Sequence, residues 1–520
     1  MVIPETRDSD QVAEAVTAEK ATAEGIHGAL RALFPLAPEP APRTWTRRGM
    51  AAAAQIAAVG LGAWVLLLRI PGLPSWDAVY AEDWWEFLVG AYQHPWRLFV
   101  PFGGYEQLLQ RVVAQFVSYL PVAQAAHAFA GVGALITAGC ALFIFHASSG
   151  HIRSAPLRVL LAVGVILLSS APMEIADSTV AVSFYLLLAM FWAVLWRPRT
   201  AAGKAAAFVV AFITAASISI VILFAPLLAM RVFALRRFRE QAVTAGWLAG
   251  CLVQLPIIII SYVQGQSRLG GYGPSGDSKT RIGGSFTFYA HDVVLRAIGW
   301  HSSWRLESLT GRDWATVIVA IALVAVFVVI MATQPGARPF VVVALLTGFV
   351  FSMVSTILTP WVTVSPVTIQ QESAARYTAL PIFLIEAAVI VGVDYALRKR
   401  RGVREQRGAG ERGAGERGAG ERGVRERNGP RRWYARAGLR PALAVTALVV
   451  ILATSWAVDF RYQGIRTVPE GGRWALHVEQ LRTGCQNSSS GEFRLHGPTD
   501  GNFVTGLPTY EWIPCSRIKL

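Results

Sequence analysis

Two adjacent carboxylates, Glu82 and Asp83, follow the first long apolar segment of the chain. Tryptophans and Glu86 come directly after them, in Tyr80-Ala-Glu-Asp-Trp-Trp-Glu-Phe-Leu. Tryptophan and tyrosine gather at the headgroup level of membranes, so we expect this stretch to lie flat on a membrane surface. A carboxylate there could accept a proton as a general base, or help to hold a divalent cation (Mg or Mn) against a phosphate. Acids that are merely solvated are the alternative.

A second pair of acids, Glu174 and Asp177, precedes the apolar segment that starts at Thr179. Residues three apart share one face of a helix, so these two could contribute to a sugar-binding or metal site. In the other interpretation, Asp177 or Ser178 is simply the N-cap of the helix that follows. Both interpretations stay open.

A phosphate-bearing substrate needs positive charge near these acids. Arg376 is the preferred candidate, because it opens an apolar segment beside Glu372 and Tyr377, and a guanidinium fork suits a phosphate at the lipid–water boundary. A side chain that only snorkels to the interface is the alternative. Further cations in predicted outside loops are Arg97, Arg111, Arg268, Lys279, Arg281, Arg296 and Arg305.

A third group of candidates surrounds His291, which precedes Asp292 and lies in a segment rich in tryptophan. Aromatic and polar side chains together suit a carbohydrate, but they suit an interfacial belt equally well. The histidines of this segment lack the spacing of zinc ligands, so we expect no zinc site. His291 is therefore a candidate for substrate binding only.

Long apolar blocks must position these residues. The chain of 520 residues is 53% hydrophobic and 16% charged, whereas soluble proteins carry about 25% charged residues. A bilayer is crossed by about 20 helical residues, so the blocks predict an all-α polytopic membrane protein with about eleven transmembrane helices. The predicted spans are 50–69, 122–146, 156–171, 179–196, 204–218, 219–235, 241–263, 314–332, 340–358, 377–397 and 441–458. The fifth and sixth could form one kinked element.

Basic residues set the orientation of these spans. They gather in alternate loops, which the positive-inside rule assigns to the cytoplasm, so the N-terminus is predicted inside and the C-terminus outside. The net charge of +15 therefore reflects topology, with contact to membrane lipids, and no nucleic acid is expected as a partner. The basic loop residues are Arg153, Arg158, Arg197, Arg199, Lys204, Arg231, Arg236, Arg237, Arg239 and Arg338.

The predicted organisation has five parts. Residues 1–49 form a disordered cytoplasmic tail, and 50–397 form a transmembrane core with large outside loops at 70–121 and 264–313. An Arg/Gly-rich cytoplasmic linker (398–440), the last transmembrane helix (441–458) and a small extracytoplasmic α/β or β unit (459–520) follow. If that unit is outside, Cys485 and Cys515 are good candidates for a disulfide.

The chain resembles the GT-C superfamily of polytopic membrane glycosyltransferases. The resemblance covers the topology of residues 50–458, and it includes the acid pair of Tyr80-Ala-Glu-Asp and an amphipathic helix at 107–120. The stretch from Trp96 to Arg111 is similar to that of uncharacterised bacterial proteins grouped near this superfamily. The resemblance implies a polyprenyl-phosphate-linked sugar as donor and a glycan, lipid or protein as acceptor. It also implies that Asp83, or its neighbour Glu82, occupies the position of the catalytic acid.

Two functions are the main candidates; a glycan polymerase or ligase with a different membrane fold and a purely structural or sensory membrane protein are further alternatives. A glycosyltransferase would displace the phosphate at the anomeric carbon of the sugar, with Asp83 or Glu82 as base. A transporter or flippase of lipid-linked saccharides needs ionisable or helix-breaking residues near the bilayer midplane, and the spans carry few, such as Pro226, Pro256 and Glu386. This asymmetry favours the enzyme. Frequent alanine, arginine and glycine indicate a GC-rich bacterial genome, hence a bacterial plasma membrane.

Overall fold

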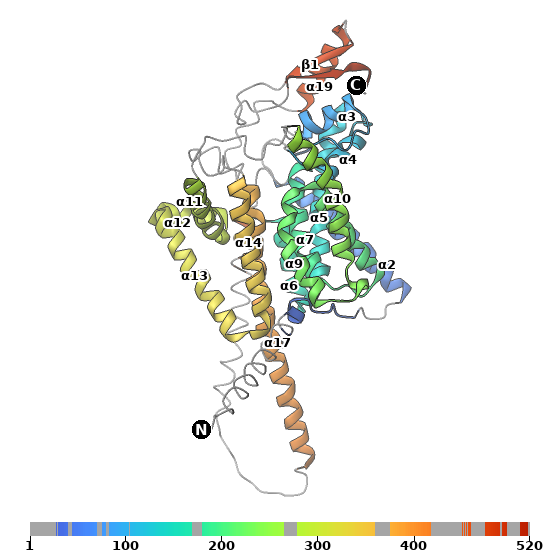
Figure 1. The fold of residues 1–520 in the computed structure, drawn as a ribbon. Helices are drawn as coiled ribbons and strands as arrows, with labels where there is room; N and C mark the ends of the chain where they lie inside the picture. The colour runs from blue at the N-terminus through green and yellow to red at the C-terminus, as the bar shows by residue number, and fades with distance from the viewer. Residues whose placement is uncertain are drawn as a thin grey trace, which may run out of the picture.

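Apolar helices make up most of the structure (Figure 1). The computed structural model describes residues 28, 30–39, 44–69, 75–77, 79, 83–102, 104–168, 179–264, 278–358, 375–417, 450, 452, 454, 456–458, 474–488, 491–496 and 510–517. Within these ranges, six helical segments are long and apolar enough to cross a membrane, consistent with the predicted multi-pass membrane protein. They contain α2 (Trp45–Leu67), α5 (Ala125–Ala147), α10 (Ala242–Val263), α13 (Arg312–Thr333), α14 (Arg338–Leu358) and α17 (Ala375–Arg417).

Shorter apolar helices fill the space between the long ones. Every predicted span from 50–69 to 377–397 coincides with a helix, although four of the ten have only shorter helices. Ile218 is extended and separates α8 from the 3-10 helix after it, so 204–218 and 219–235 form two elements. The shorter elements are α4 (Leu108–Val117), α6 (Ala155–Ile166), α7 (Thr179–Leu195), α8 (Ala201–Ser217), η5 (Ser219–Phe224) and α9 (Ala225–Ala234).

Helix α7 is the centre of the core. All side chains from Leu187 to Val194 are fully buried. The helix packs against α5, α8 and α17, and the sequence of this segment is apolar on every side, as expected for a helix surrounded by others. Because α7 has 17 residues, its two ends lie about 25 Å apart.

The described part of the N-terminal segment packs onto this core. Leu33 and Phe34 are fully buried, and Leu36 forms a parallel bridge with Arg197. The sequence predicted a disordered tail over 1–49, and this part of that prediction is wrong. The reason is local: the apolar run Leu33-Phe-Pro-Leu can bury its side chains against the bundle, which its polar surroundings in the sequence obscure.

Helix α17 is longer than the predicted span. It continues through position 397 to Arg417, into the predicted linker. Near this crossing, the Asp394 carboxylate accepts hydrogen bonds from the backbone N–H groups of Arg153 and Ser154, at 3.0 and 2.9 Å, and from Arg398. The extension leaves the bundle at the end opposite to α19 (Figure 1).

A small unit closes the other end of the bundle. It consists of α19 (Trp474–Asn487) and an antiparallel pair of strands, β1 (Glu492–His496) and β2 (Tyr510–Pro514), in which Glu492 faces Pro514 and His496 faces Tyr510. A disulfide joins Cys485 to Cys515, which is the pairing expected from the sequence. In Figure 1 this unit lies above α3 (Val89–Gln93) and α4.

Helices α11 (Ser278–Phe288) and α12 (Trp300–Thr310) lie on the far side of α14 from α4 and α5 (Figure 1). A π-helical turn η7 (Tyr289–Val294) and a 3-10 turn η8 (Leu295–Ile298) connect them. The described residues of loop 264–313 are therefore mostly helical; α11 packs against α14, α12 against α13, and η7 and η8 against α13 and α17.

Candidate functional site

Asp83 binds the first residue of the central helix. It begins the π-helical turn η2 (Asp83–Leu88), and its side chain is fully buried. One carboxylate oxygen accepts a hydrogen bond from the backbone N–H of Thr179 at 2.9 Å, and the other accepts one from the Thr179 hydroxyl. A negative charge at a helix N-terminus is favourable, because the unpaired N–H groups there carry partial positive charge. Asp83 thus fixes the segment between α2 and α4 to the start of α7.

The backbone at Glu106 is held by Gln254 of α10. The Glu106 N–H donates to Gln254 Oε1 at 3.0 Å, and Gln254 Nε2 donates to the Glu106 carbonyl at 2.7 Å. These two hydrogen bonds use the backbone N–H and carbonyl of Glu106 and do not involve its carboxylate. They also join the segment between α2 and α4 to the long helix α10.

The Glu106 carboxylate is the least satisfied acid among the described residues of this region. It has no exposed surface, and neither of its oxygens makes a hydrogen bond within the described part of the chain. Arg111 Nε lies 3.8 Å from Oε1. Burial raises the pKa of Glu106 from 4.5 to about 8, although the positive charge of Arg111 opposes the shift. Buried acids with strongly shifted pKa values are concentrated at functional sites.

Arg111 connects two acids of the segment between α2 and α4, Glu86 and Glu106. It lies on α4, and its guanidinium forms an ion pair with Glu86 Oε1 at 2.7 Å in addition to its contact with Glu106. The guanidinium carbon also lies 5.4 Å from the centroid of the Phe87 ring. We call Asp83, Glu86, Glu106 and Arg111 the loop-one cluster.

Helix α4 is fixed to α7 and α8 by side-chain contacts. Gln110 Nε2 donates to the Ser183 hydroxyl at 2.6 Å, and the Leu109 N–H donates to the Ser217 hydroxyl at 3.1 Å. The amphipathic helix predicted over 107–120 is therefore present, as α4, and its polar face is buried toward the bundle. The Gln110 amide oxygen has no hydrogen-bond partner among the described residues.

Trp84 does not lie on a membrane surface as the sequence predicted. It is 1% exposed, and its ring meets Trp474 of α19 edge to face with centroids 5.0 Å apart. Trp474 Nε1 in turn donates to the Val122 carbonyl at 2.8 Å. The prediction is wrong because the C-terminal unit covers this stretch, and a contact between such distant segments leaves no local pattern.

Tyr377 and Arg376, both predicted to bind substrate, stand at the start of α17. The Tyr377 ring meets Phe184 edge to face at 5.8 Å, and the Arg376 guanidinium carbon lies 5.8 Å from the Tyr377 centroid. Phe184 follows Ser183, which binds Gln110 of α4. The first turns of α7 therefore contact both α4, through Ser183, and the start of α17, through Phe184.

His291 belongs to a different cluster of charges. Its Nε2 lies 3.3 Å from Asp313 Oδ1, and the neighbouring Asp292 pairs with Arg312 at 3.1 Å. Burial lowers the pKa of His291 and raises that of Asp292. η7, which carries His291, packs against α11, α13 and α17. In Figure 1, α14 stands between α12 and α4, so His291 belongs to a part of the fold away from the acids of loop one.

Three of the predicted site residues, Glu82, Glu174 and Asp177, lie outside the described residues. Among those that are described, no group of three His, Cys, Asp or Glu side chains could hold a metal ion. The divalent cation proposed for Asp83 remains a prediction. The described oxygens of Asp83 already accept hydrogen bonds from Thr179.

Sequence reasoning missed Glu106, although it stands in the stretch that carries the resemblance. A single acid before an amphipathic helix looks like any helix start, and its burial depends on α10, which is far away in the sequence. The Tyr105-Glu-Gln-Leu-Leu-Gln-Arg segment did contain one signal: four polar side chains interrupt an otherwise apolar helix pattern. No family model, curated protein or solved structure matches the chain, so the function must be argued from this geometry.

Proposed function

We propose that the chain is a membrane glycosyltransferase that moves a sugar from a polyprenyl-phosphate donor to an extracytoplasmic glycan, lipid or protein acceptor. The acceptor hydroxyl attacks the anomeric carbon of the sugar, and the bond from this carbon to the phosphate oxygen breaks. The hydroxyl proton passes to a carboxylate of the loop-one cluster, and polyprenyl phosphate leaves. The resemblance to GT-C enzymes supports this reaction class.

The observation that carries the proposal is the buried Glu106 carboxylate. A general base works best when its pKa lies near the working pH, and burial brings Glu106 to about 8. Its oxygens accept no hydrogen bond from the described residues, so a substrate hydroxyl that reached them would meet an unused acceptor. Arg111, 3.8 Å away, can stabilise the carboxylate once it has lost its proton.

Asp83 and Glu82 have different roles in the proposed reaction. The hydrogen bonds of Asp83 to Thr179 suit a positioning role, since accepting a proton would weaken the contact that fixes loop one to α7. Glu82, its neighbour, remains the other candidate base. Arg376 is the proposed partner of the donor phosphate, because it stands at the start of α17 beside Tyr377.

The proposal includes the finer topology. With α6, α7, α8 and the η5–α9 pair counted as spans, together with 441–458, the chain has about eleven transmembrane helices. Residues 459–520 then form an extracytoplasmic α/β unit over loop one, the N-terminus is cytoplasmic, and the membrane is the plasma membrane of a bacterium. The basic loops support this orientation.

The test is sugar transfer by the purified full chain in lipid, with a set of polyprenyl-phosphate sugars and lipid extracts as acceptors. We expect Glu106→Gln to lower the rate at least 100-fold, in the range of a lost general base. Asp83→Asn and Glu82→Gln, measured beside it, separate the three acids. Glu479→Gln, on the exposed face of α19, is the matched control and should leave the rate unchanged. Full transfer by the Glu106→Gln protein would exclude Glu106 as the base.

A transporter or flippase of lipid-linked saccharides is the second candidate, and one observation favours it. Glu386 lies within the apolar part of α17 and is 6% exposed, and ionisable residues inside membrane helices commonly mark transport pathways. Movement of a labelled lipid-linked saccharide across proteoliposomes, lost in Glu386→Gln but kept in Glu106→Gln, would support this function over the enzyme.

A further inference from the structure

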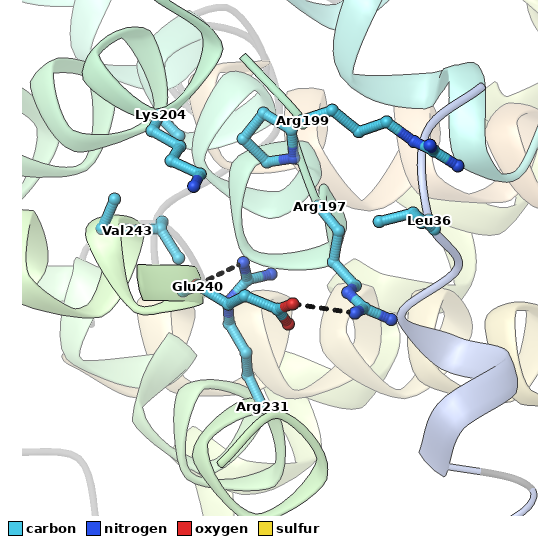
Figure 2. Close-up of a pocket in the computed structure, with 10 residues that line it drawn as sticks. Leu36, Arg197, Arg199, Lys204, Arg231, Glu240 and Val243 are labelled. Carbon is cyan, nitrogen blue, oxygen red and sulfur yellow. Dashed lines mark hydrogen bonds and ion pairs between the residues drawn. The ribbon is translucent and has the colours of Figure 1, made fainter. Parts of the chain in front are cut away.

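A basic cavity lies at the end of the bundle opposite to the loop-one cluster. Its volume is about 210 Å³, and its walls come from the N-terminal segment, the residues after α7, the first turn of α8, α9 and the start of α10. The lining contains four cations and one acid, which are Arg197, Arg199, Lys204, Arg231 and Glu240 (Figure 2).

Arg231 is a buried part of this lining. Its side chain is 2% exposed, and its guanidinium donates to the Val194 carbonyl and, at 2.9 Å, to the Glu240 carbonyl. Its Nε is buried and has no hydrogen-bond partner in the described chain. A buried guanidinium that is not fully paired is costly, and an anion in the cavity would offset this cost.

The Glu240 carboxylate cannot neutralise the other cations. It forms an ion pair with Arg197 at 3.0 Å, as the dashed line in Figure 2 shows. Arg197 Nε is also buried and unpartnered among the described residues. Arg199 is directed to the N-terminal segment, where its Nε donates to the Ala37 carbonyl at 2.8 Å and its guanidinium lies 3.6 Å from the Glu39 carboxylate. With Arg197 paired to Glu240 and Arg199 to Glu39, the positive charges of Lys204 and Arg231 remain in excess.

Lys204 is a lining cation whose charge is not paired with a described residue. It stands in the first turn of α8, and its ammonium makes no hydrogen bond or ion pair that involves the described residues. Figure 2 shows this side chain directed into the space between Val243 and Arg197. The N-terminus of α8, where Thr200 accepts from the Gly203 N–H at 3.1 Å, adds partial positive charge beside it.

We propose that this cavity binds a phosphate group. Arginine and lysine are the side chains that recognise phosphate, and here Arg197, Lys204 and Arg231 line one cavity. The volume is several times the ~30 Å³ that a water molecule occupies in the liquid, so it can hold a phosphate with part of its substituent. The phosphate is either a free phosphate ester or the headgroup of an anionic lipid. The proposal is independent of the function proposed for loop one.

The test uses the full chain in nanodiscs and inorganic pyrophosphate as the soluble probe. In discs of phosphatidylcholine, calorimetry should show pyrophosphate binding that Lys204→Gln weakens at least tenfold, as expected for a lost charge-assisted hydrogen bond. Lys204→Arg should restore it. Arg237→Gln, an exposed arginine of the same end that is not part of the lining, is the matched control and should change affinity less than twofold.

Nanodiscs that contain phosphatidic acid test whether the phosphate group belongs to the headgroup of an anionic lipid. If these discs stabilise the wild type against heat but do not stabilise Lys204→Gln, and pyrophosphate does not bind, the cavity takes a lipid headgroup. Equal weakening by Lys204→Gln and Arg237→Gln would show only general attraction of anions and would overturn the proposal. The absence of any effect from both probes would overturn it as well.

Discussion

The two buried carboxylates of loop one have different partners, and this difference separates their roles. Asp83 has both oxygens bonded to Thr179, whereas Glu106 has neither oxygen bonded to a described group. A carboxylate with both oxygens hydrogen-bonded to one residue fixes geometry. An unbonded one in a dry environment holds its proton until the pH approaches its raised pKa.

We expect Asp83→Asn to destabilise the protein by about 1–3 kcal/mol, because an amide can accept only one of the two hydrogen bonds and leaves a buried group unpaired. Thermal unfolding in detergent is the measurement. Thr179→Val removes the same hydroxyl contact, so the double variant should cost less than the sum of the two single ones. Strict additivity would show that the contact between them contributes nothing.

Glu106 should make stability depend on pH. Its pKa is raised from 4.5 to about 8 in the folded chain, so the folded state binds this proton more tightly than the unfolded state does. The contribution of Glu106 to the free energy of unfolding is fully present below pH 4.5 and is lost as the pH rises towards 8. The unfolding temperature of wild type should therefore fall between pH 5 and 8 more steeply than that of Glu106→Gln. Parallel curves for the two proteins would contradict the shift.

Sequence reasoning reached some of these residues and not others. It selected Asp83 because an acid pair beside tryptophans is a visible pattern, and it noted Arg111 as an outside cation. It did not select Glu106, whose significance comes from Gln254 and from burial. It used Lys204 and Arg231 only as markers of topology, because a cavity between five segments has no signature in any one of them.

At the scale of elements, the closest helix packing joins α8 and α10 at two glycines spaced four apart. A Cβ atom on Gly246 would lie 2.3 Å from the Phe208 carbonyl oxygen, and one on Gly250 would lie 2.5 Å from the Ala215 Cβ. Small residues at this spacing allow two membrane helices to approach each other closely. This contact brings Gln254, on the same helix, to the backbone of Glu106.

Gly246→Ala should destabilise the protein by about 1–3 kcal/mol, because the backbone of α8 would have to move away. Loss of the native elution volume and a lower unfolding temperature are the measurements. Gly131→Ala in α5 is the matched control: no atom lies within 4 Å of its added Cβ, so it should be neutral. A neutral Gly246→Ala would mean that α8 and α10 separate easily.

The sequence predicted the positions of the helices better than it predicted which helices and segments contact each other. Hydrophobic blocks predicted the helices, and α7 begins at Thr179, the first residue of the predicted span. The continuation of α17 to Arg417 was missed, because glycines in the repeat indicated a linker while its Ala, Glu and Arg residues favour a helix. Contacts between distant segments, such as Trp84 with Trp474, depend on packing that periodicity does not encode.

At the scale of the whole molecule, α7 separates two charged regions. The loop-one cluster lies at its start, and the basic cavity follows its end, about 25 Å away by helix length. That distance approaches the ~30 Å of a bilayer core, so the two regions should face opposite sides of the membrane.

We therefore expect a tag after Leu520 to be cut by an impermeant protease on intact cells, and a tag before Met1 to be protected until the membrane is opened. The pair Cys485 and Cys515 should react with an impermeant thiol reagent only after reduction. Cleavage of the N-terminal tag on intact cells would reverse the orientation.

The helix that covers Trp84, α19, comes from the C-terminal part of the chain. Trp474 reaches back to Val122, 352 positions earlier, and covers Trp84. During synthesis, the first loop therefore leaves the ribosome long before the segment that covers it. Until α19 has been made, Trp84 lacks the cover of Trp474. The order of translation thus makes synthesis of α19 a precondition for the packing around Trp84, so we expect a product truncated before Trp474 to leave the Trp84 ring exposed.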